Sequence, residues 1–269
     1  MRGTGLAQVL MIQFDKVTKG YGNASSPALH EVSFEVQAGE LVALVGGSGS
    51  GKTTTLKCIN RLVEPDSGEI YLNGRSVRTQ PGPALRRHVG YVFQGIGLFP
   101  HLSVAENIGI TPRLLGWDRA RIAARVEDLL DLVELPREFG ARAPAALSGG
   151  QRQRVGVARA LAAEPKVVLM DEPFGALDPL TRDTLGRAYR TLHEQMQLTT
   201  VLVTHDMVEA LLIADRILVM QSGRLLANDT PERLLQSDND PIVRELLDMP
   251  RKQAERLRTL FPVTRDSDA

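Results

Sequence analysis

Two hydrophobic periodicities divide this chain into predicted strands and predicted helices. Short apolar or alternating runs, typical of β-strands, occur at residues 12–14, 32–36, 41–45, 69–72, 89–93, 167–171, 200–204 and 216–220. Apolar residues at helical spacing occur at residues 51–63, 120–133, 150–163, 179–196 and 207–213. From residue 167 onward strands and helices alternate, which predicts a parallel α/β sheet with right-handed crossovers.

The stretch 96–162 departs from that alternation because its patterns are mostly helical. We therefore predict an inserted helical subdomain within one α/β domain that covers residues 12–235. An N-terminal extension over 1–11 precedes this domain, with Met11 as an alternative start. A helical tail over 236–269 follows it, and we expect no separate regulatory domain there because so few residues remain.

The tail has an amphipathic pattern over residues 241–261, where apolar residues are interspersed with several arginines. One interpretation is a helix that packs on its own domain. The other is a helix that lies on a membrane surface. The sequence favours the first and leaves the second open.

Composition excludes several classes of protein. Lys and Arg number 32 and Asp and Glu also number 32, so no net charge draws the whole chain to nucleic acid or an anionic bilayer. The single cysteine, Cys58, excludes an internal disulfide framework and a cysteine-rich metal site. No apolar run reaches the ~18 residues of a membrane span, and the N-terminus lacks the pattern of a secretory signal. We expect a cytoplasmic chain whose work at a membrane would need other subunits.

A glycine-rich segment between a predicted strand and a predicted helix fits the phosphate-loop pattern G-x-x-x-x-G-K-[ST]. It comprises Gly46, Gly47, Ser48, Gly49, Ser50, Gly51, Lys52 and Thr53, and the helix continues with Thr54. The glycines let successive N–H groups point at phosphate oxygens near the positive end of the helix dipole. We expect Lys52 to reach the β- and γ-phosphates of a nucleotide and Thr53 to ligate Mg²⁺. The alternative is an ordinary flexible turn, and the flanking strand and helix argue against it.

Two adjacent acids, Asp171 and Glu172, follow the apolar run at 167–170. Their side chains should leave the strand end on opposite sides. Asp171 is then suited to the Mg²⁺ shell, and Glu172 to polarising the water that attacks the γ-phosphate. Solvated acids at an ordinary strand end are the alternative, which a neighbouring phosphate loop disfavours.

The segment 147–151 reads LSGGQ, and here the chain resembles the ATP-binding cassette (ABC) ATPases, whose signature has that sequence. On the residues alone, Ser148 could simply be a helix N-cap, and a lone histidine is usually a tolerated core or surface residue. The resemblance nevertheless covers about residues 12–235. It carries over the signature residues Ser148, Gly149, Gly150 and Gln151, the adenine-stacking Tyr21, the γ-phosphate-sensing Gln94, Asp178 in the dimer-contact segment 175–178, and the switch histidine His205.

The resemblance implies a fold, a chemistry and a set of partners. The fold is a P-loop NTPase (RecA-like) α/β core with an antiparallel β-subdomain and an inserted α-helical subdomain. Lys52, Gln94, Glu172 and His205 are implied as catalytic, and Thr53, Gln94 and Asp171 as the residues around Mg²⁺. A head-to-tail homodimer would hold two ATP molecules between the phosphate loop of one copy and the signature of the other. Further partners would be transmembrane permease subunits and, indirectly, a solute-binding protein, at the cytoplasmic face of the inner (plasma) membrane.

Shorter segments sharpen the resemblance to importer ATPases. The segments 56–62, 96–101 and 114–117 look most like the osmoprotectant group, which carries glycine betaine, choline or proline betaine. Polar amino-acid importers share some of these features and stay as the alternative. A non-transport ABC ATPase acting on nucleic acid or the ribosome is disfavoured by the single cassette and zero net charge. Gly95 departs from the pattern, since many relatives place a second glutamine after Gln94.

The position of Gln94 also predicts a coupling surface. The glutamine ends a strand and leads directly into the helical insertion, so a response to the γ-phosphate could rotate the insertion. We predict a groove between the insertion and the core that receives a short helix of a membrane subunit. Leu98, Phe99 and Leu102 are the predicted apolar anchors. The alternative is that these side chains only pin the loop to its own domain.

Overall fold

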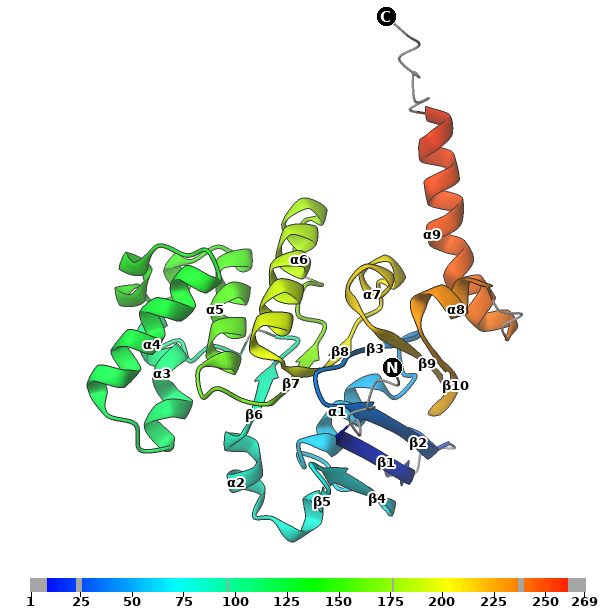
Figure 1. Cartoon of the computed structure of the whole chain (residues 1–269), viewed down its shortest axis with the longest axis horizontal. Coiled ribbons are helices and arrows are strands. Elements are labelled where there is room, and N and C mark those ends of the chain that lie inside the picture. The colour runs from blue at the N-terminus through cyan, green and yellow to red at the C-terminus, as the bar shows by residue number, and fades with distance from the viewer. Residues whose placement is uncertain (1–8, 23–25, 96, 176, 237–239, 261–269) are drawn as a thin grey trace, which may run out of the picture.

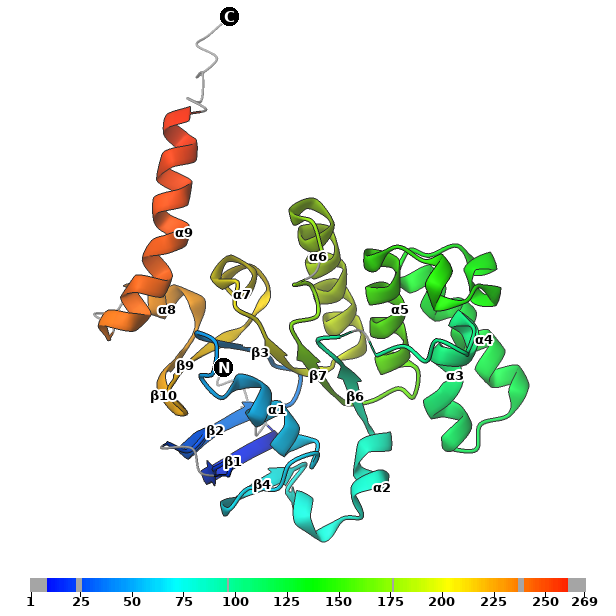
Figure 2. The same ribbon diagram turned by 180° about the vertical axis from the view of Figure 1, so that it is seen from behind.

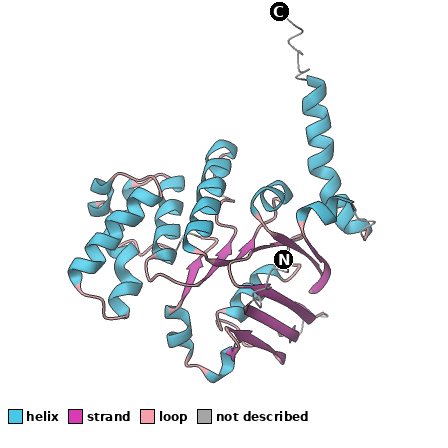
Figure 3. Ribbon diagram, viewed as in Figure 1, coloured by secondary structure: helices cyan, strands magenta, loops and turns pink. Residues whose placement is uncertain are grey.

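The computed structural model describes residues 9–22, 26–95, 97–175, 177–236 and 240–260. In this part of the chain the central element is a six-stranded sheet of order β10-β9-β3-β8-β7-β6 (Figures 1 and 3). Its strands are β3 (Leu41–Val45), β6 (Val89–Val92), β7 (Val167–Asp171), β8 (Thr199–Val203), β9 (Arg216–Gln221) and β10 (Arg224–Asp229). All neighbours pair in parallel except β10, which pairs antiparallel with β9.

Both faces of this sheet are covered, and β3 shows how the sequence achieves this. Leu41, Ala43 and Val45 pack in one hydrophobic cluster, with residues of the helices on that face. Val42 and Leu44 pack in a second cluster on the opposite face. A strand with both faces buried needs a continuous apolar run, which is the pattern found at 41–45.

A second, antiparallel sheet packs below the first in the order β2-β1-β4-β5 (Figure 1). Its strands are β1 (Leu10–Lys19), β2 (Leu29–Gln37), β4 (Ser67–Leu72) and β5 (Arg75–Ser76). Helix α1 (Lys52–Ile59) contacts β7 and β8 of the core sheet and β4 of the antiparallel sheet. Its buried residues Leu56 and Ile59 belong to the hydrophobic cluster that joins the two sheets. The predicted antiparallel β-subdomain is therefore confirmed.

The predicted helical insertion is also confirmed. It contains α3 (Val104–Leu114), α4 (Arg119–Leu132) and α5 (Gly149–Leu161), with the short 3₁₀ helices η2 (Arg137–Ala141) and η3 (Pro144–Ala146) between α4 and α5. These helices gather at one end of the molecule in both views (Figures 1 and 2). Helices α6 (Pro179–Met196) and α7 (Met207–Ile213) cover the core sheet on its other face from α1.

Several boundaries differ from the predictions. Strand β1 begins at Leu10 rather than at residue 12, and residues 1–8 of the predicted extension lie outside the described residues. Helix α1 ends at Ile59 instead of about residue 63, because Arg61 adopts a left-handed conformation with φ 49°. The elements β5, η1 (Val77–Thr79), α2 (Gly82–Arg87), β10 and α8 (Pro231–Gln236) were not predicted.

The tail forms helix α9 (Pro241–Leu260). Val243 and Leu247 near its start are buried in the core cluster, and the helix contacts α7, as packing on its own domain predicts. Further along, the helix leads away from the body of the molecule (Figures 1 and 2). Residue 261 of the predicted tail helix lies outside the described residues. Among the helices that are described, none is long and apolar enough to cross a bilayer.

Candidate active site

The phosphate-loop segment connects β3 to α1 at the edge where the parallel strands end. Three of its glycines have backbone conformations that other residues rarely adopt, with φ 148° at Gly46, 75° at Gly49 and 106° at Gly51. A Cβ on Gly46 would lie 2.1 Å from the carbonyl oxygen of Met220, and one on Gly51 would lie 2.5 Å from that of Ala28. Glycine is therefore required at both positions by conformation and by space.

Lys52 lies inside this loop, with 7% of its surface exposed. Its Nζ donates to the carbonyl oxygens of Gly46 at 2.7 Å and Gly47 at 2.9 Å. Burial lowers the pKa of the Lys52 ammonium, while the carboxylates of Glu172 and Asp171 act in the opposite direction. The ammonium group is thus held by neutral acceptors of the loop, which a phosphate can replace as a stronger, charged acceptor.

The start of α1 is open to an anion. Its N-cap, Gly51, has no side chain with which to cap the helix, and the first turn contains no acidic residue. Ser48 and Gly49 of the preceding loop are exposed. Within the described part of the chain, the first N–H groups of this helix therefore face the loop without a side-chain acceptor, which is the arrangement that binds phosphate.

Thr53 and Asp171 come together across the site, although 118 residues separate them, with Thr53 Oγ1 donating to Asp171 Oδ1 at 3.0 Å. Burial raises the pKa of Asp171, which is 4% exposed, while the hydrogen bond from Thr53 opposes this shift. The described residues include no cluster of three His, Cys, Asp or Glu side chains that could hold a metal alone. Two hard oxygen donors beside a phosphate cradle instead fit Mg²⁺, which usually completes its shell with phosphate and water.

Glu172 occupies a strained position directly after β7. Its φ is 48°, a left-handed value that costs energy outside glycine, and its N–H donates to Val203 at 2.9 Å. One carboxylate oxygen accepts a hydrogen bond from Gln94 Nε2 at 2.9 Å, and the other lies 3.5 Å from His205 Nδ1. The structure therefore brings together three of the predicted catalytic residues, from the ends of β6, β7 and β8.

The sequence of this chain matches a known protein family. The family model described as ABC transporter matches residues 29–175, more than half of the chain. This chain belongs to the ABC transporter family. The structure accordingly has the α/β core, antiparallel sheet and helical insertion that the resemblance implied.

Individual members of this family are also similar to this chain over most of its length. The carnitine transport ATP-binding protein OpuCA of Listeria monocytogenes is 45% identical over 237 residues, which are 88% of this chain and 59% of the relative. The glycine betaine uptake system ATP-binding protein YehX of Escherichia coli is 48% identical over 235 residues, 87% of this chain and 76% of the relative. A dimeric, post-hydrolysis structure of the ATP-binding cassette MJ0796 with ADP and Pi has a TM-score of 0.76 at 33% identity, over 82% of this chain and 99% of that one. This chain thus spans less than two thirds of the length of OpuCA.

The residues of the ABC signature lie apart from the phosphate loop, on the helical insertion. Ser148 caps α5 by accepting from the N–H of Gln151, whose side chain accepts from the N–H of Ser148 in return. Ser148 and Gly149 are exposed, and Gly150 is partly exposed. The helix-capping interpretation is therefore correct, and the same capped start leaves the signature facing solvent.

Two other positions carried over from the family are also on the surface. Asp178 caps α6 by accepting from the N–H of Thr181 at 3.0 Å, and this hydrogen-bonded partner lowers its pKa. Tyr21 is 46% exposed, with Lys19 Nζ 5.7 Å from its ring. Ala176 of the predicted dimer-contact segment lies outside the described residues. Their predicted roles at adenine and at a dimer contact remain predictions.

Sequence reasoning missed some residues that hold the site and the nearby loop in place. Arg182 pairs with Asp206 at 2.8 Å, directly beside His205. Neither residue was predicted to have a role at the site, and nothing in the local pattern marks the two as partners. Asn107 is fully buried and holds the loop at Phe99 by accepting from its N–H at 2.8 Å and donating to its carbonyl at 3.1 Å. A buried Asn within an apolar helical stripe was the available signal for this role.

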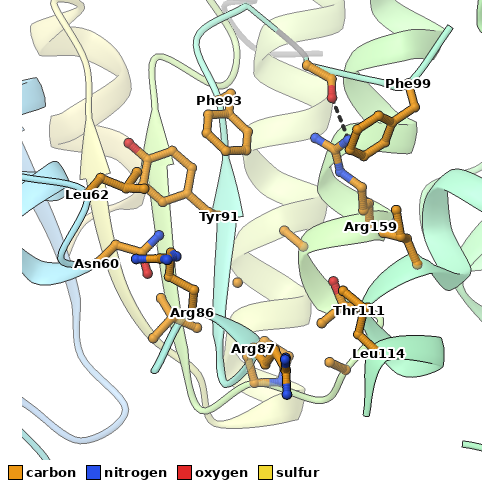
Figure 4. A pocket seen from close by; sticks show the side chains of 17 residues that line it. Asn60, Leu62, Arg86, Arg87, Tyr91, Phe93, Phe99, Thr111, Leu114 and Arg159 are labelled. Carbon is orange, nitrogen blue, oxygen red and sulfur yellow. Dashed lines mark hydrogen bonds between the residues drawn. The ribbon is translucent and has the colours of Figure 1, made fainter. Parts of the chain in front are cut away.

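A groove lies between the core and the helical insertion (Figure 4). Its volume is about 410 Å³. Large exposed side chains line it from the loop after α1, the loop between β6 and α3, and the end of α3: Leu62, Phe93, Phe99 and Leu114. Arg159, which lies beside Phe99 in Figure 4, donates to the carbonyl of Gly97 at 2.6 Å. Phe99 is thus the one predicted anchor among the lining residues described. Leu98 packs against its own core cluster, as the alternative interpretation predicts, and Leu102 is partly buried.

Proposed function

We propose that this chain binds ATP at the loop 46–53 and hydrolyses it as the motor subunit of an importer. The observation that carries this is the position of Glu172, whose carboxylate lies between Gln94 and His205 at the strand edge that also carries Thr53 and Asp171. A carboxylate held from two sides is suited to orient a water for in-line attack on a terminal phosphate.

Each residue of the site has a distinct task in this reaction. Lys52 exchanges its loop carbonyls for β- and γ-phosphate oxygens, and the open start of α1 binds the remaining phosphate charge. Thr53 and Asp171 would hold Mg²⁺, which when bound neutralises phosphate charge. Glu172 orients and deprotonates water. His205, with 58% of its side chain exposed, is free to turn from Glu172 toward a γ-phosphate.

The exposed signature supports a dimer as the working unit. Ser148 and Gly149 cap a helix start, which is an anion-binding feature, yet they stand on a different subdomain from the phosphate loop. In a head-to-tail homodimer the signature of each copy would complete the nucleotide site of the other. Two γ-phosphates would then draw the copies together, and hydrolysis would release them.

The first experiment tests hydrolysis and dimerisation together. We expect Glu172→Gln to lower ATP turnover by about 10²-fold or more while ATP binding persists, because the base is lost and the phosphate contacts remain. Size-exclusion chromatography with ATP should then show a stable dimer. Ser148→Arg should bind ATP but neither dimerise nor hydrolyse, because a bulky cation blocks the second half of the site. Glu138→Gln, at an exposed acid away from the site, is the control. Wild-type turnover in Glu172→Gln would overturn the assignment.

The proposed cargo is a quaternary ammonium osmoprotectant, such as glycine betaine or choline. The support is the likeness to relatives named for carnitine and glycine betaine transport. Polar amino acids are the alternative. In proteoliposomes that contain the assembled transporter, we expect glycine betaine or choline to stimulate ATPase activity, and glutamine or histidine to have no effect. The reverse pattern would favour the amino-acid alternative.

The groove in Figure 4 is the proposed docking site for a transmembrane permease subunit at the cytoplasmic face of the membrane. Phe93 and Phe99 are 43% and 41% exposed, and large apolar side chains gathered in a hollow favour an amphipathic helix as occupant. Phe93 directly precedes Gln94, so a shift at Gln94 on nucleotide binding or hydrolysis would reach the groove at once.

Phe99→Ser tests this docking site. We expect basal ATPase activity of the isolated subunit to stay close to wild type, because Phe99 is partly exposed and its main chain is held by Asn107. Solute-stimulated activity of the assembled transporter should be lost. Leu235→Ser, at a residue 57% exposed on α8, is the matched control. Unimpaired stimulation in Phe99→Ser would contradict the proposal.

A further inference from the structure

A polar cluster lies directly behind His205, and the proposed reaction does not yet use it. It consists of Arg182 on α6, Thr204 and Asp206 on either side of the histidine, and Glu209 on α7. The side chains of Arg182 and Asp206 are 26% and 27% exposed, so their ion pair is largely shielded from solvent. Such a pair holds its geometry better than an exposed one.

Arg182 binds two separate segments with one guanidinium. Its Nη1 lies 2.8 Å from Asp206 Oδ2, and its Nη2 donates to the carbonyl of Leu177 at 3.2 Å. Leu177 directly precedes Asp178, the residue expected at the dimer contact. The planar guanidinium therefore links the segment that leads to Asp178 with the segment that carries His205.

The far side of this link is itself rigid. Asp206 Oδ1 accepts from the N–H groups of Val208 at 2.9 Å and Glu209 at 3.2 Å, and so caps α7. The N–H of Asp206 donates to Thr204 Oγ1 at 3.0 Å, and the Thr204 hydroxyl donates to the buried carboxylate of Glu209. The main chain on both sides of His205 is thus fixed, so a force on Asp206 moves the histidine with it.

We propose that Arg182 is a positioning residue that makes the segment of Asp178 and the segment of His205 move together. Contact of a second copy at Asp178 then sets His205 for the γ-phosphate, so hydrolysis begins only after the dimer has formed. This inference rests on the proposed ATPase function and adds to it the route by which dimer contact reaches the histidine.

Arg182→Met removes the charge and both hydrogen bonds but keeps a long side chain. We expect kcat to fall by about tenfold to a hundredfold, the range for a misplaced catalytic group. ATP binding to the monomer should be unchanged, because Arg182 has no contact with the phosphate loop among the described residues. The Hill coefficient for ATP should fall toward 1. Arg182→Lys, which keeps a charge for Asp206 but cannot span both segments, should lie between Arg182→Met and wild type.

Asp206→Asn tests the other half of the link, because it loses the charge while an amide oxygen can still cap α7. The double variant with Arg182→Met should be no slower than the slower single variant, since both variants break the same contact between Arg182 and Asp206. Arg187→Met is the matched control on the same helix. Among the described residues it breaks only the Arg187–Asp183 pair, whose arginine is 77% exposed, and it should leave kcat unchanged.

The outcomes separate this inference from the proposed function. Wild-type kcat and Hill coefficient in Arg182→Met and Arg182→Lys would overturn the inference while leaving the ATPase in place. A loss explained entirely by weaker ATP binding or by a lower fraction of folded protein would also overturn it. Failure of the wild-type chain to hydrolyse ATP, or full activity in Glu172→Gln, would instead overturn the proposed function.

Discussion

Two histidines at opposite edges of the core sheet have opposite environments. His205 follows β8 at the edge of the phosphate loop, with 58% of its side chain exposed and one contact to Glu172 at 3.5 Å. His193 lies on α6 near the beginning of β8 and is 1% exposed. Its Nε2 lies 3.1 Å from the carbonyl of Gly39, and its Nδ1 lies 3.0 Å from the hydroxyl of Thr200.

The hydrogen-bonding partners of His193 determine which ring nitrogen carries the proton and which way the neighbouring hydroxyl groups donate. A carbonyl only accepts, so Nε2 must carry the hydrogen and donate to Gly39. Nδ1 then accepts from the Thr200 hydroxyl, whose oxygen accepts in turn from Tyr189 at 2.7 Å. Both ring nitrogens of His193 are thus occupied by partners within the protein. At the other edge, Lys52 and His205 hold contacts that a ligand can replace, so residue type alone does not separate a structural histidine from a reactive one.

The largest expected effect comes from His205→Ala. ATP turnover should fall by about 10²–10³-fold, the range for removing one donor that stabilises developing charge. The free energy of unfolding should stay within about 0.5 kcal/mol of wild type because the side chain is mostly exposed. Steady-state kinetics and urea unfolding measure the two quantities. If His205→Ala also lowered the free energy of unfolding, then His205 would have a structural role like that of His193, and the contrast between the two edges would be wrong.

His193→Leu should do the reverse. It leaves the carbonyl of Gly39 and the hydroxyl of Thr200 without their partner, at a cost of about 1–3 kcal/mol each. We expect unfolding to become easier by about 2–4 kcal/mol, measured by urea denaturation. Turnover per folded molecule should match wild type below the transition. A specific loss of kcat in the folded variant would contradict a purely structural role.

Lys52→Ala addresses the replaceable contacts directly. ATP affinity should fall by about 1.5–3 kcal/mol, or roughly tenfold to 150-fold, because a charged donor to phosphate disappears. Equilibrium binding of a fluorescent ATP analogue measures this loss. Unchanged affinity would mean that the bonds of Lys52 to Gly46 and Gly47 are its final contacts rather than ones that a phosphate replaces.

The smallest effect is on the pH dependence of the free energy of unfolding. The sign of this dependence differs between the two edges. Burial lowers the pKa of His193 below its ordinary 6.5, so the unfolded chain binds this proton first and stability is lost as the pH falls below about 6.5. Burial raises the pKa of Glu209, behind His205, from 4.5 to about 7, so its contribution to stability is present at low pH and lost as the pH rises toward 7. Each group changes the slope of the free energy of unfolding against pH by at most about 1.4 kcal/mol per pH unit.

Unfolding free energies of His193→Leu and Glu209→Gln between pH 5 and pH 8 separate these opposing contributions. Relative to wild type, His193→Leu should flatten the acid-side loss of stability. Glu209→Gln should remove the loss that accompanies rising pH. Equal slopes in all three proteins would contradict both assignments.

The parts of the candidate site whose positions follow from the residues alone are those encoded by adjacent residues. The phosphate loop and the pair Asp171–Glu172 each lie in one short segment, and backbone geometry alone brings their groups together. The link from Arg182 to Asp206 spans 24 residues and two helices, so it depends on how α6 packs beside α7 and has no local pattern.

The missed elements of the fold have a related explanation. Strand β10 follows β9 through Ser222 and Gly223, whose φ values of 46° and 76° form a tight turn, and Ser-Gly was the available signal. Its residues are only partly buried at the sheet edge, so their alternation is weak. Helix α1 stops early for a tertiary reason, since Arg61 donates to Glu64 and to the carbonyl of Gln80.

The strand order of the core sheet has a consequence for biosynthesis. Strand β3, which delivers the phosphate loop, pairs with β8 and β9, and Val45 and Thr199 are 154 residues apart. At about 5–20 residues per second, roughly 8–30 s pass between the synthesis of β3 and that of its first neighbour in the sheet. During that interval the nascent chain carries the complete phosphate-loop sequence without the sheet that shapes it. A nucleotide can therefore bind and stabilise the fold only late in translation, when the strands around the loop have left the ribosome.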